Sequence, residues 1–167
     1  MKSDVNLMTR ETHVQLQAEL VKLQERLERA GKKLGEAFGP NCDWHDNSAA
    51  DLAVEEFRMI ENREADLRKI LQVTKIIRPR RDTADVGVGN TIVVRMGDSD
   101  VDKKFTLLGP RDSMTGKNRG WISYLSLVGQ ALLGMKRGET KTLELGEGRA
   151  QTIIVKEILP GNFGNGA

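Results

Sequence analysis

Two aspartates three positions apart, Asp43 and Asp46, are the residues of this chain best suited to chemistry. They lie in the stretch Asn41–Asn47, together with the only cysteine of the chain, Cys42, and with His45. Carboxylate oxygens suit Mg²⁺, which usually keeps several waters and completes its coordination from a partner or a substrate phosphate. Two carboxylates supply only part of such a site. We therefore expect a second molecule to complete it.

Two other interpretations of the same residues remain. Zinc would need Cys42, Asp43, His45 and Asp46 as ligands, but four ligands within five residues are too closely spaced for one tetrahedron, and no second cluster is available. Alternatively, the two aspartates could cap the following helix and interact with its dipole, worth up to about 1 kcal/mol each. Residue spacing alone leaves helix capping and a partial magnesium site open.

Two long helical patterns flank this stretch. The first has an apolar seam with the alternating spacing of a coiled coil, made of Leu16, Leu20, Leu23, Leu27, Ala30, Leu34 and Ala37. Thr9 is placed to cap this helix, and Gly39-Pro40 ends it because proline cannot donate the helical hydrogen bond. The second seam comprises Ala50, Ala53, Phe57, Ile60, Glu64, Leu67 and Leu71. Two seams around one short break predict an antiparallel hairpin with the aspartates at its tip.

Glu64 is the one charged residue on the second seam. A buried carboxylate without a partner is costly, and long cationic side chains can reach across a helix surface. We therefore expect Glu64 to pair with Lys22 or Arg26 on the first helix.

Beyond the basic connector Lys75–Arg81 the pattern changes to short β-like runs at 91–96, 103–108, 120–124, 140–145 and 151–158. One short helix is expected at Ser126–Leu133, closed by Gly134. The sequence thus predicts an α+β protein in which a mostly antiparallel sheet carries one helix. The expected parts are a hairpin at 1–76, a linker at 77–82, a sheet domain at 83–159 and a disordered tail at 160–167.

Composition limits the classes of function. The chain has 167 residues, a net charge of +2 and no apolar run of the roughly 18 residues that a membrane span requires, so we expect no membrane partner. A single cysteine cannot form an internal disulfide, and the first residues do not resemble an export signal. We therefore expect a cytoplasmic protein.

Several short motifs together resemble the GreA/GreB family of bacterial transcript cleavage factors. The resemblance runs from Met8-Thr9 to about Leu159, and it places the family's tip motif, Asp-x-x-Glu-Asn, at Asp43–Asn47. In the second half the matching stretches are Leu108–Asp112, Ile122–Ser126 and Gly129–Gly134, followed by Gly138. Each motif is weak alone, whereas their common order and spacing indicate family membership.

The resemblance implies a specific fold and activity. The N-terminal coiled-coil hairpin would enter the secondary channel of RNA polymerase core, and a small FKBP-like domain without isomerase activity would dock at its rim. Asp43 and Asp46 would hold Mg²⁺ jointly with the polymerase, with Trp44 and Asn47 shaping the tip. The factor, not itself an enzyme, would stimulate the polymerase to cleave the 3′ end of backtracked nascent RNA. Docking would use Ser123, Ser126, Leu127 and Gly129.

Two departures from the family pattern matter for this activity. Asp46 stands where the family has glutamate, which shortens the carboxylate's reach by about 1.5 Å, and misplacement of about 1 Å can cost on the order of 100-fold in rate. Leu127 replaces the proline that follows the docking serine. The resemblance therefore also allows a channel binder that inhibits or modulates transcription without stimulating cleavage.

Overall fold

The chain forms two compact units. The computed structural model describes residues 6–38, 48–97, 99–116, 119–144 and 150–163. Residues Val14–Val73 form one unit, called here the helical unit, while Met1–His13 and Thr74–Ala167 together form the other, the sheet unit. The predicted α+β class is confirmed. Among the residues described, no helix is long and apolar enough to cross a membrane.

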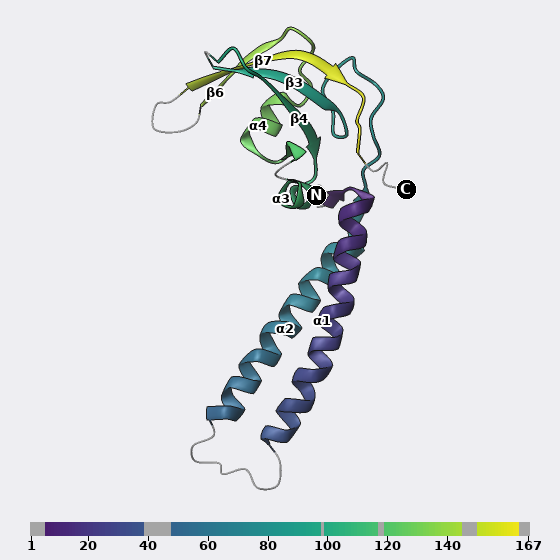
Figure 1. Ribbon diagram of the computed structural model, residues 1–167, viewed down its shortest axis with the longest axis vertical. Coiled ribbons are helices and arrows are strands. Elements are labelled where there is room, and N and C mark those ends of the chain that lie inside the picture. Colours follow the sequence, from purple (N-terminus) through teal and green to yellow (C-terminus); the bar gives the residue numbers. More distant parts are fainter. Residues whose placement is uncertain (1–5, 39–47, 98, 117–118, 145–149, 164–167) are drawn as a thin grey trace. The chain divides into compact units, whose positions relative to one another are not determined.

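The helical unit is the predicted hairpin. Helices α1 (Arg10–Ala37) and α2 (Ser48–Gln72) run side by side in opposite directions (Figure 1) and are about 42 Å and 38 Å long at 1.5 Å per residue. The seams are buried between them, most completely at Leu16, Leu23, Ala30, Ala50, Ile60 and Leu67. The apolar periodicity therefore predicted the packed faces correctly. Helix α1 begins inside the sheet unit, where the Thr9 hydroxyl accepts a hydrogen bond from the Thr12 amide at 3.3 Å as its cap.

Glu64 is buried and paired, but not as predicted. Its carboxylate accepts a hydrogen bond from Gln24 Nε2 at 3.3 Å and forms an ion pair with Arg68. The expected pairing with Lys22 or Arg26 is wrong. Arg68 lies one helical turn further along α2, so its guanidinium reaches the carboxylate along the same helix face, while Gln24 faces it across the seam.

The sheet unit contains a five-stranded sheet in the order β5-β4-β3-β7-β6. Its strands are β3 (Thr91–Met96), β4 (Asp102–Leu108), β5 (Trp121–Ser123), β6 (Thr140–Glu144) and β7 (Ala150–Leu159). Each predicted β-like run coincides with one of these strands to within one residue at either end. All neighbouring pairs are antiparallel except β4 and β5, which are parallel.

The core of this unit lies between the sheet and helix α4 (Leu127–Leu132), which packs against one face (Figure 1). Ala131 and Leu132 of α4 meet a cluster of strand residues that includes Ile92, Val94, Leu107, Ile153 and Val155. A second short helix, α3 (Pro110–Thr115), corrects the prediction of a single helix. Met114 is the one large apolar side chain of this helix, so no apolar period marked it in the sequence.

The N-terminal residues join the sheet unit rather than the hairpin to which residues 1–76 were assigned. Strand β1 (Asn6–Met8) pairs in parallel with β2 (Thr74–Ile76). Beside it, the fully buried Asp112 of α3 accepts hydrogen bonds from the Thr9 amide at 3.0 Å, the Thr9 hydroxyl at 2.7 Å and the Gly109 amide at 3.1 Å. Thr9 and Asp112 are far apart in the sequence, so no local residue pattern could predict this contact.

The prediction that residues 160–167 form a disordered tail is wrong for residues 160–163, and residues 164–167 lie outside the described part of the chain. Phe163 is buried in an apolar cluster with Ile77, Leu108 and Trp121. The Gly161 amide donates to the Arg80 carbonyl at 3.0 Å. Glycine, proline and asparagine dominate this segment and suggested disorder, yet the buried Phe163 ring and the Gly161 hydrogen bond both hold it on the sheet unit.

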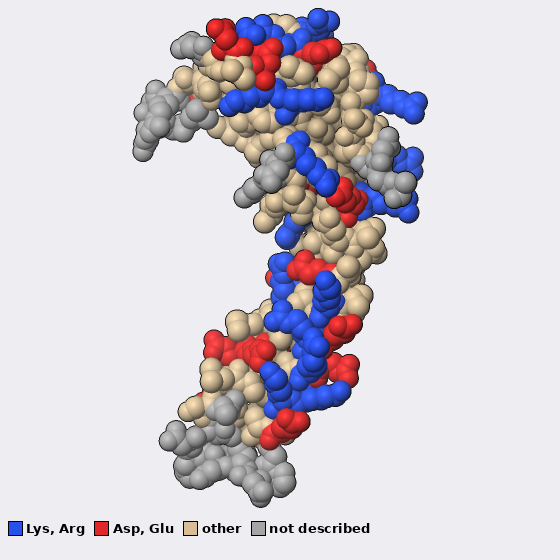
Figure 2. All heavy atoms as spheres, in the orientation of Figure 1, with Lys and Arg blue, Asp and Glu red and all other residues tan. Residues whose placement is uncertain are grey.

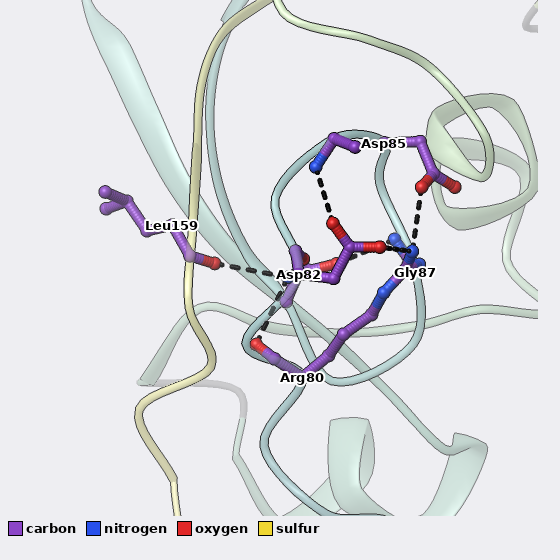
Figure 3. A network of polar contacts seen from close by, with 7 residues as sticks. Arg80, Asp82, Asp85, Gly87 and Leu159 are labelled. Carbon is purple, nitrogen blue, oxygen red and sulfur yellow. Dashed lines mark hydrogen bonds and ion pairs between the residues drawn. The ribbon is translucent and has the colours of Figure 1, made fainter.

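A polar network ties the linker to the sheet (Figure 3). The Arg80 guanidinium pairs with Asp82 at 2.9 Å and Asp85 at 2.7 Å. The pKa of Asp82 lies below its ordinary value because its carboxylate accepts a hydrogen bond from the Ala84 amide and a further one from Arg80. Its contribution to stability is therefore present above its ordinary pKa and is lost as the pH falls through the lowered value.

Buried Asn90 completes this network. Its side-chain oxygen accepts from the Gly87 amide at 2.9 Å, and its side-chain nitrogen donates to the Asp82 carbonyl at 2.9 Å and to the Leu159 carbonyl at 3.4 Å. One side chain thus joins the linker, the turn before β3 and the end of β7.

Candidate functional site

The predicted tip residues Asp43, Trp44, Asp46 and Asn47 lie outside the described residues. Helix α1 ends at Ala37 and α2 begins at Ser48, on either side of the predicted site. Within the described parts of the chain, no group of three or more histidine, cysteine, aspartate or glutamate side chains is arranged to hold a metal ion. The shared magnesium site at Asp43 and Asp46 stays a prediction.

The four predicted docking residues come together in one tight turn. Residues 123–129, called here the docking loop, lead from β5 into α4. The Ser123 carbonyl accepts hydrogen bonds from the Ser126 amide at 3.0 Å and the Ser126 hydroxyl at 2.7 Å. The Ser126 hydroxyl in turn accepts from the Gly129 amide at 3.1 Å and so caps α4. Both serines therefore fix the backbone of this loop.

Gly129 is fixed by close packing of backbones. A Cβ added at this position would lie 2.0 Å from the Ser123 carbonyl oxygen and 2.9 Å from the Tyr124 Cα. Both distances are shorter than van der Waals contact allows, and both neighbours are backbone atoms. Any larger residue must therefore displace the docking loop.

We expect Gly129→Ala to displace the docking loop and to destabilise the sheet unit by about 2 kcal/mol, since overpacking typically costs 1–3 kcal/mol. Amide exchange at Tyr124 and Ser126 would rise in the same variant. Gly134→Ala is a useful comparison, because it tests a glycine that needs a positive φ (76°) but has no atom near the added Cβ. Loop amides that exchange as slowly in Gly129→Ala as in the wild type would contradict the steric argument.

The docking loop exposes two large apolar side chains. Leu125 is 56% exposed and Leu127 is 50% exposed, on either side of the part-buried Ser126 hydrogen bonds. Apolar side chains held on a rigid turn suit a protein partner, because little conformational entropy is lost when they are covered. Leu125 was not among the predicted docking residues. Its position between a strand end and a helix cap was the signal available in the sequence.

A basic hollow on the helical unit was also not predicted. Arg26, Arg29 and Lys33 of α1 line a space of about 220 Å³ whose floor includes Ala30 and Ile60. Figure 2 shows Lys and Arg side chains interleaved with acidic ones along this unit. Lys33 pairs with Glu56 at 3.8 Å, whereas Arg26 and Arg29 form no ion pair with any residue that the structure describes. Guanidinium groups in such a setting can bind phosphate oxygens.

Comparison with known proteins adds evidence over nearly the whole chain. The family model described as "Transcription elongation factor, GreA/GreB, C-term" matches residues 81–160. Transcription elongation factor GreA of Caldanaerobacter subterraneus subsp. tengcongensis is 34% identical over 140 residues, covering 83% of this chain and 86% of the relative. GreA of Desulfovibrio desulfuricans is 33% identical over 114 residues, covering 68% of this chain and 69% of the relative.

Among solved structures, GreA factor homolog 1 of Thermus thermophilus is 25% identical, with 92% of this chain and 97% of that chain covered and a TM-score of 0.42. The two GreA sequences, each above 30% identity over at least two thirds of this chain, carry the assignment. The chain belongs to the GreA/GreB family of transcription elongation factors.

Proposed function

We propose that this protein binds RNA polymerase core through the secondary channel and stimulates the polymerase to cleave the 3′ end of backtracked nascent RNA. Membership of the GreA/GreB family is the observation that carries this proposal. Two features of the chain support it. A coiled-coil hairpin leads to a stretch with two aspartates, and the sheet unit presents a rigid loop with exposed leucines.

In this proposal Asp43 and Asp46 hold Mg²⁺ jointly with the polymerase. Both are hard oxygen ligands, and two carboxylates leave most of the coordination shell to a partner, as an accessory site requires. Bound there, the ion would stabilise charge on the attacking and leaving oxygens of the RNA backbone. Trp44 and Asn47 would keep the two carboxylates oriented toward that position.

The docking loop would hold the factor on the polymerase. Ser123, Ser126 and Gly129 set its backbone, and Leu127 offers the apolar contact. On the helical unit, the hollow lined by Arg26, Arg29 and Lys33 is suited to phosphates of the nascent RNA. Both surfaces lie on described residues, so each can be changed without altering the aspartates.

A channel binder that inhibits transcription without stimulating cleavage is the second candidate. The observation that favours it is Asp46, whose carboxylate is shorter than the glutamate of the family pattern. Such a factor would slow nucleotide addition, and the slowing would survive Asp43→Asn and Asp46→Asn.

The deciding experiment adds the protein to backtracked transcription complexes with Mg²⁺ at neutral pH and follows release of the RNA 3′ fragment. The main proposal expects faster release. An unchanged release rate contradicts cleavage stimulation, and slower nucleotide addition in the same complexes would then support the second candidate. Failure to bind polymerase core would contradict both.

Leu127→Asp is expected to weaken binding to polymerase core by about tenfold or more. Aspartate is well tolerated in the first turn of a helix, so α4 should persist while the apolar contact is replaced by a charge. Leu127→Pro should fold equally well, because proline suits the first helical position. Met114→Asp, which changes a 66% exposed side chain on α3, is the matched control. Equal dissociation constants for Leu127→Asp and Met114→Asp would contradict this role.

A further inference from the structure

Phe163 belongs to the apolar cluster that also holds residues of β4 and β5. Its side chain is only 6% exposed and belongs to the cluster formed with Ile77, Leu108 and Trp121. Residues 160–163, called here the strap, therefore bring one aromatic ring into the cluster that contains Leu108 and Trp121.

Leu108 and Trp121 position the docking loop directly. Leu108 lies opposite Ser123 in the parallel β4–β5 pair, and its carbonyl accepts a hydrogen bond from the Tyr124 amide at 2.9 Å. Trp121 is the first residue of β5, the strand that ends at Ser123. A displacement of either residue would therefore move the start of the loop.

The backbone of the strap follows one defined path. The Gly161 amide donates to the Arg80 carbonyl at 3.0 Å, and a Cβ at Gly161 would lie 1.9 Å from the Gly89 carbonyl oxygen. Only glycine fits so close to another backbone. The Asn90 side chain also donates a hydrogen bond to the Leu159 carbonyl, immediately before the strap. Two hydrogen bonds therefore hold the backbone that leads to Phe163.

Trp121 is held from further directions. The Arg119 guanidinium lies over its ring, 4.9 Å from the centroid, and the same guanidinium pairs with Glu11 at 2.9 Å. A Cβ added at Gly116 would lie 2.2 Å from the ring, so no larger residue fits there. With Phe163 in the same cluster, the indole has little freedom to move. The strap thus completes a packed support for β5.

We propose that Phe163 is a positioning residue for the docking loop. By filling the cluster that contains Leu108 and Trp121, it keeps β5 and the Ser123–Ser126 turn in the conformation that binds RNA polymerase. Gly161, Asn162 and Phe163 lie beyond the family match, which ends at residue 160. The inference rests on the proposed function for its binding part and on the structure alone for its effect on the loop.

The test compares the full-length wild type with Phe163→Ala, Phe163→Leu and, as a matched control, Asn162→Ala at an exposed neighbour. Amide exchange is read at Tyr124, Ser126 and Gly129, with Val155 as a reference because its amide donates to the Glu139 carbonyl within the sheet region. The dissociation constant for polymerase core is measured with the same four proteins.

In Phe163→Ala we expect loop amides to exchange about tenfold faster, Val155 to remain unchanged and polymerase binding to weaken by about tenfold. Phe163→Leu should keep most of the slow loop exchange and most of the polymerase affinity of the wild type. Asn162→Ala should match the wild type in both measurements. Unchanged loop exchange overturns the inference, as does a uniform rise that includes Val155. If Phe163→Ala does not fold, Phe163→Leu is expected to show a smaller but measurable rise in exchange at the loop amides with Val155 unchanged, and loop amides that exchange as in the wild type overturn the inference. If the wild type does not bind polymerase core, the proposed function is contradicted. The amide-exchange data would still show whether Phe163 positions the loop.

Discussion

Asparagine at position 43 or 46 is expected to lower stimulated RNA cleavage by about 100-fold or more, while binding to RNA polymerase core persists. The substitution keeps the shape of each side chain but removes its negative charge, so the magnesium ion of the proposed function would lose a strong ligand. Binding should persist because the docking loop is untouched. Cleavage rates in backtracked complexes and dissociation constants for polymerase core measure the two effects separately.

Asp51→Asn is the matched control, because Asp51 is an exposed carboxylate in the first turn of α2. It tests whether loss of one negative charge near the start of α2 is sufficient to reduce cleavage. The interpretation in which Asp43 and Asp46 only cap that helix expects all three variants to cleave alike. Such a result would remove both aspartates from the proposed chemistry.

Asp46→Glu tests the same site in the opposite direction. Adding one methylene restores the carboxylate reach of the family pattern, and a gain in cleavage rate would show that position 46 limits the activity. A loss of rate would indicate that the tip of this chain is arranged for the shorter side chain. Whether the cleavage rate rises or falls, Asp46→Glu should have the same dissociation constant for polymerase core as the wild type.

Asp112→Asn is expected to destabilise the sheet unit by about 3 kcal/mol. The carboxylate accepts from the Thr9 amide, the Thr9 hydroxyl and the Gly109 amide and is fully buried. An asparagine would turn one acceptor into a donor facing other donors, and each unsatisfied buried group costs about 1–3 kcal/mol. Urea unfolding followed by Trp121 fluorescence, in a Trp44→Phe background, would report the loss in this unit.

Asp102→Asn provides the comparison for Asp112. Asp102 is an acid of the same unit that pairs with Arg95 at 2.9 Å, but the pair is largely exposed, so its loss should cost less than about 1 kcal/mol. Equal stability losses in the two variants would contradict the argument from burial. Thr9→Ser, which keeps the hydroxyl, should retain most of the stability of the wild type.

Periodic features could be predicted from the sequence because neighbouring residues produce them. The two seams follow the helical repeat, so the paired faces of α1 and α2 were evident from Leu16 to Leu71. The strands of the sheet were visible as short β-branched runs for the same reason. Thr9, Ser126 and Gly134 also act within a few residues of their own positions, as an N-cap, an N-cap and a positive-φ turn.

Features that depend on distant partners could not be predicted in this way. The partner of Glu64 on α1 depended on which side chain faced it across the seam, and no spacing distinguished Gln24 from Arg26. The four ordered residues at 160–163 looked disordered because the apolar cluster that receives Phe163 is assembled from Ile77, Leu108 and Trp121. The basic hollow likewise exists only because α1 and α2 pack together.

The hairpin, the strands, the candidate aspartates and the resemblance to the GreA/GreB family could all be predicted without the fold, because each depends on local spacing or on residue identity. The folded arrangement was needed to show that Ser123 and Ser126 fix the docking loop, that Asp112 binds the start of α1 and that Phe163 is buried with Leu108 and Trp121. Those contacts join residues that are distant along the chain or oriented by a turn. Hydrogen bonding and close packing depend on such distances and orientations, which residue spacing does not contain.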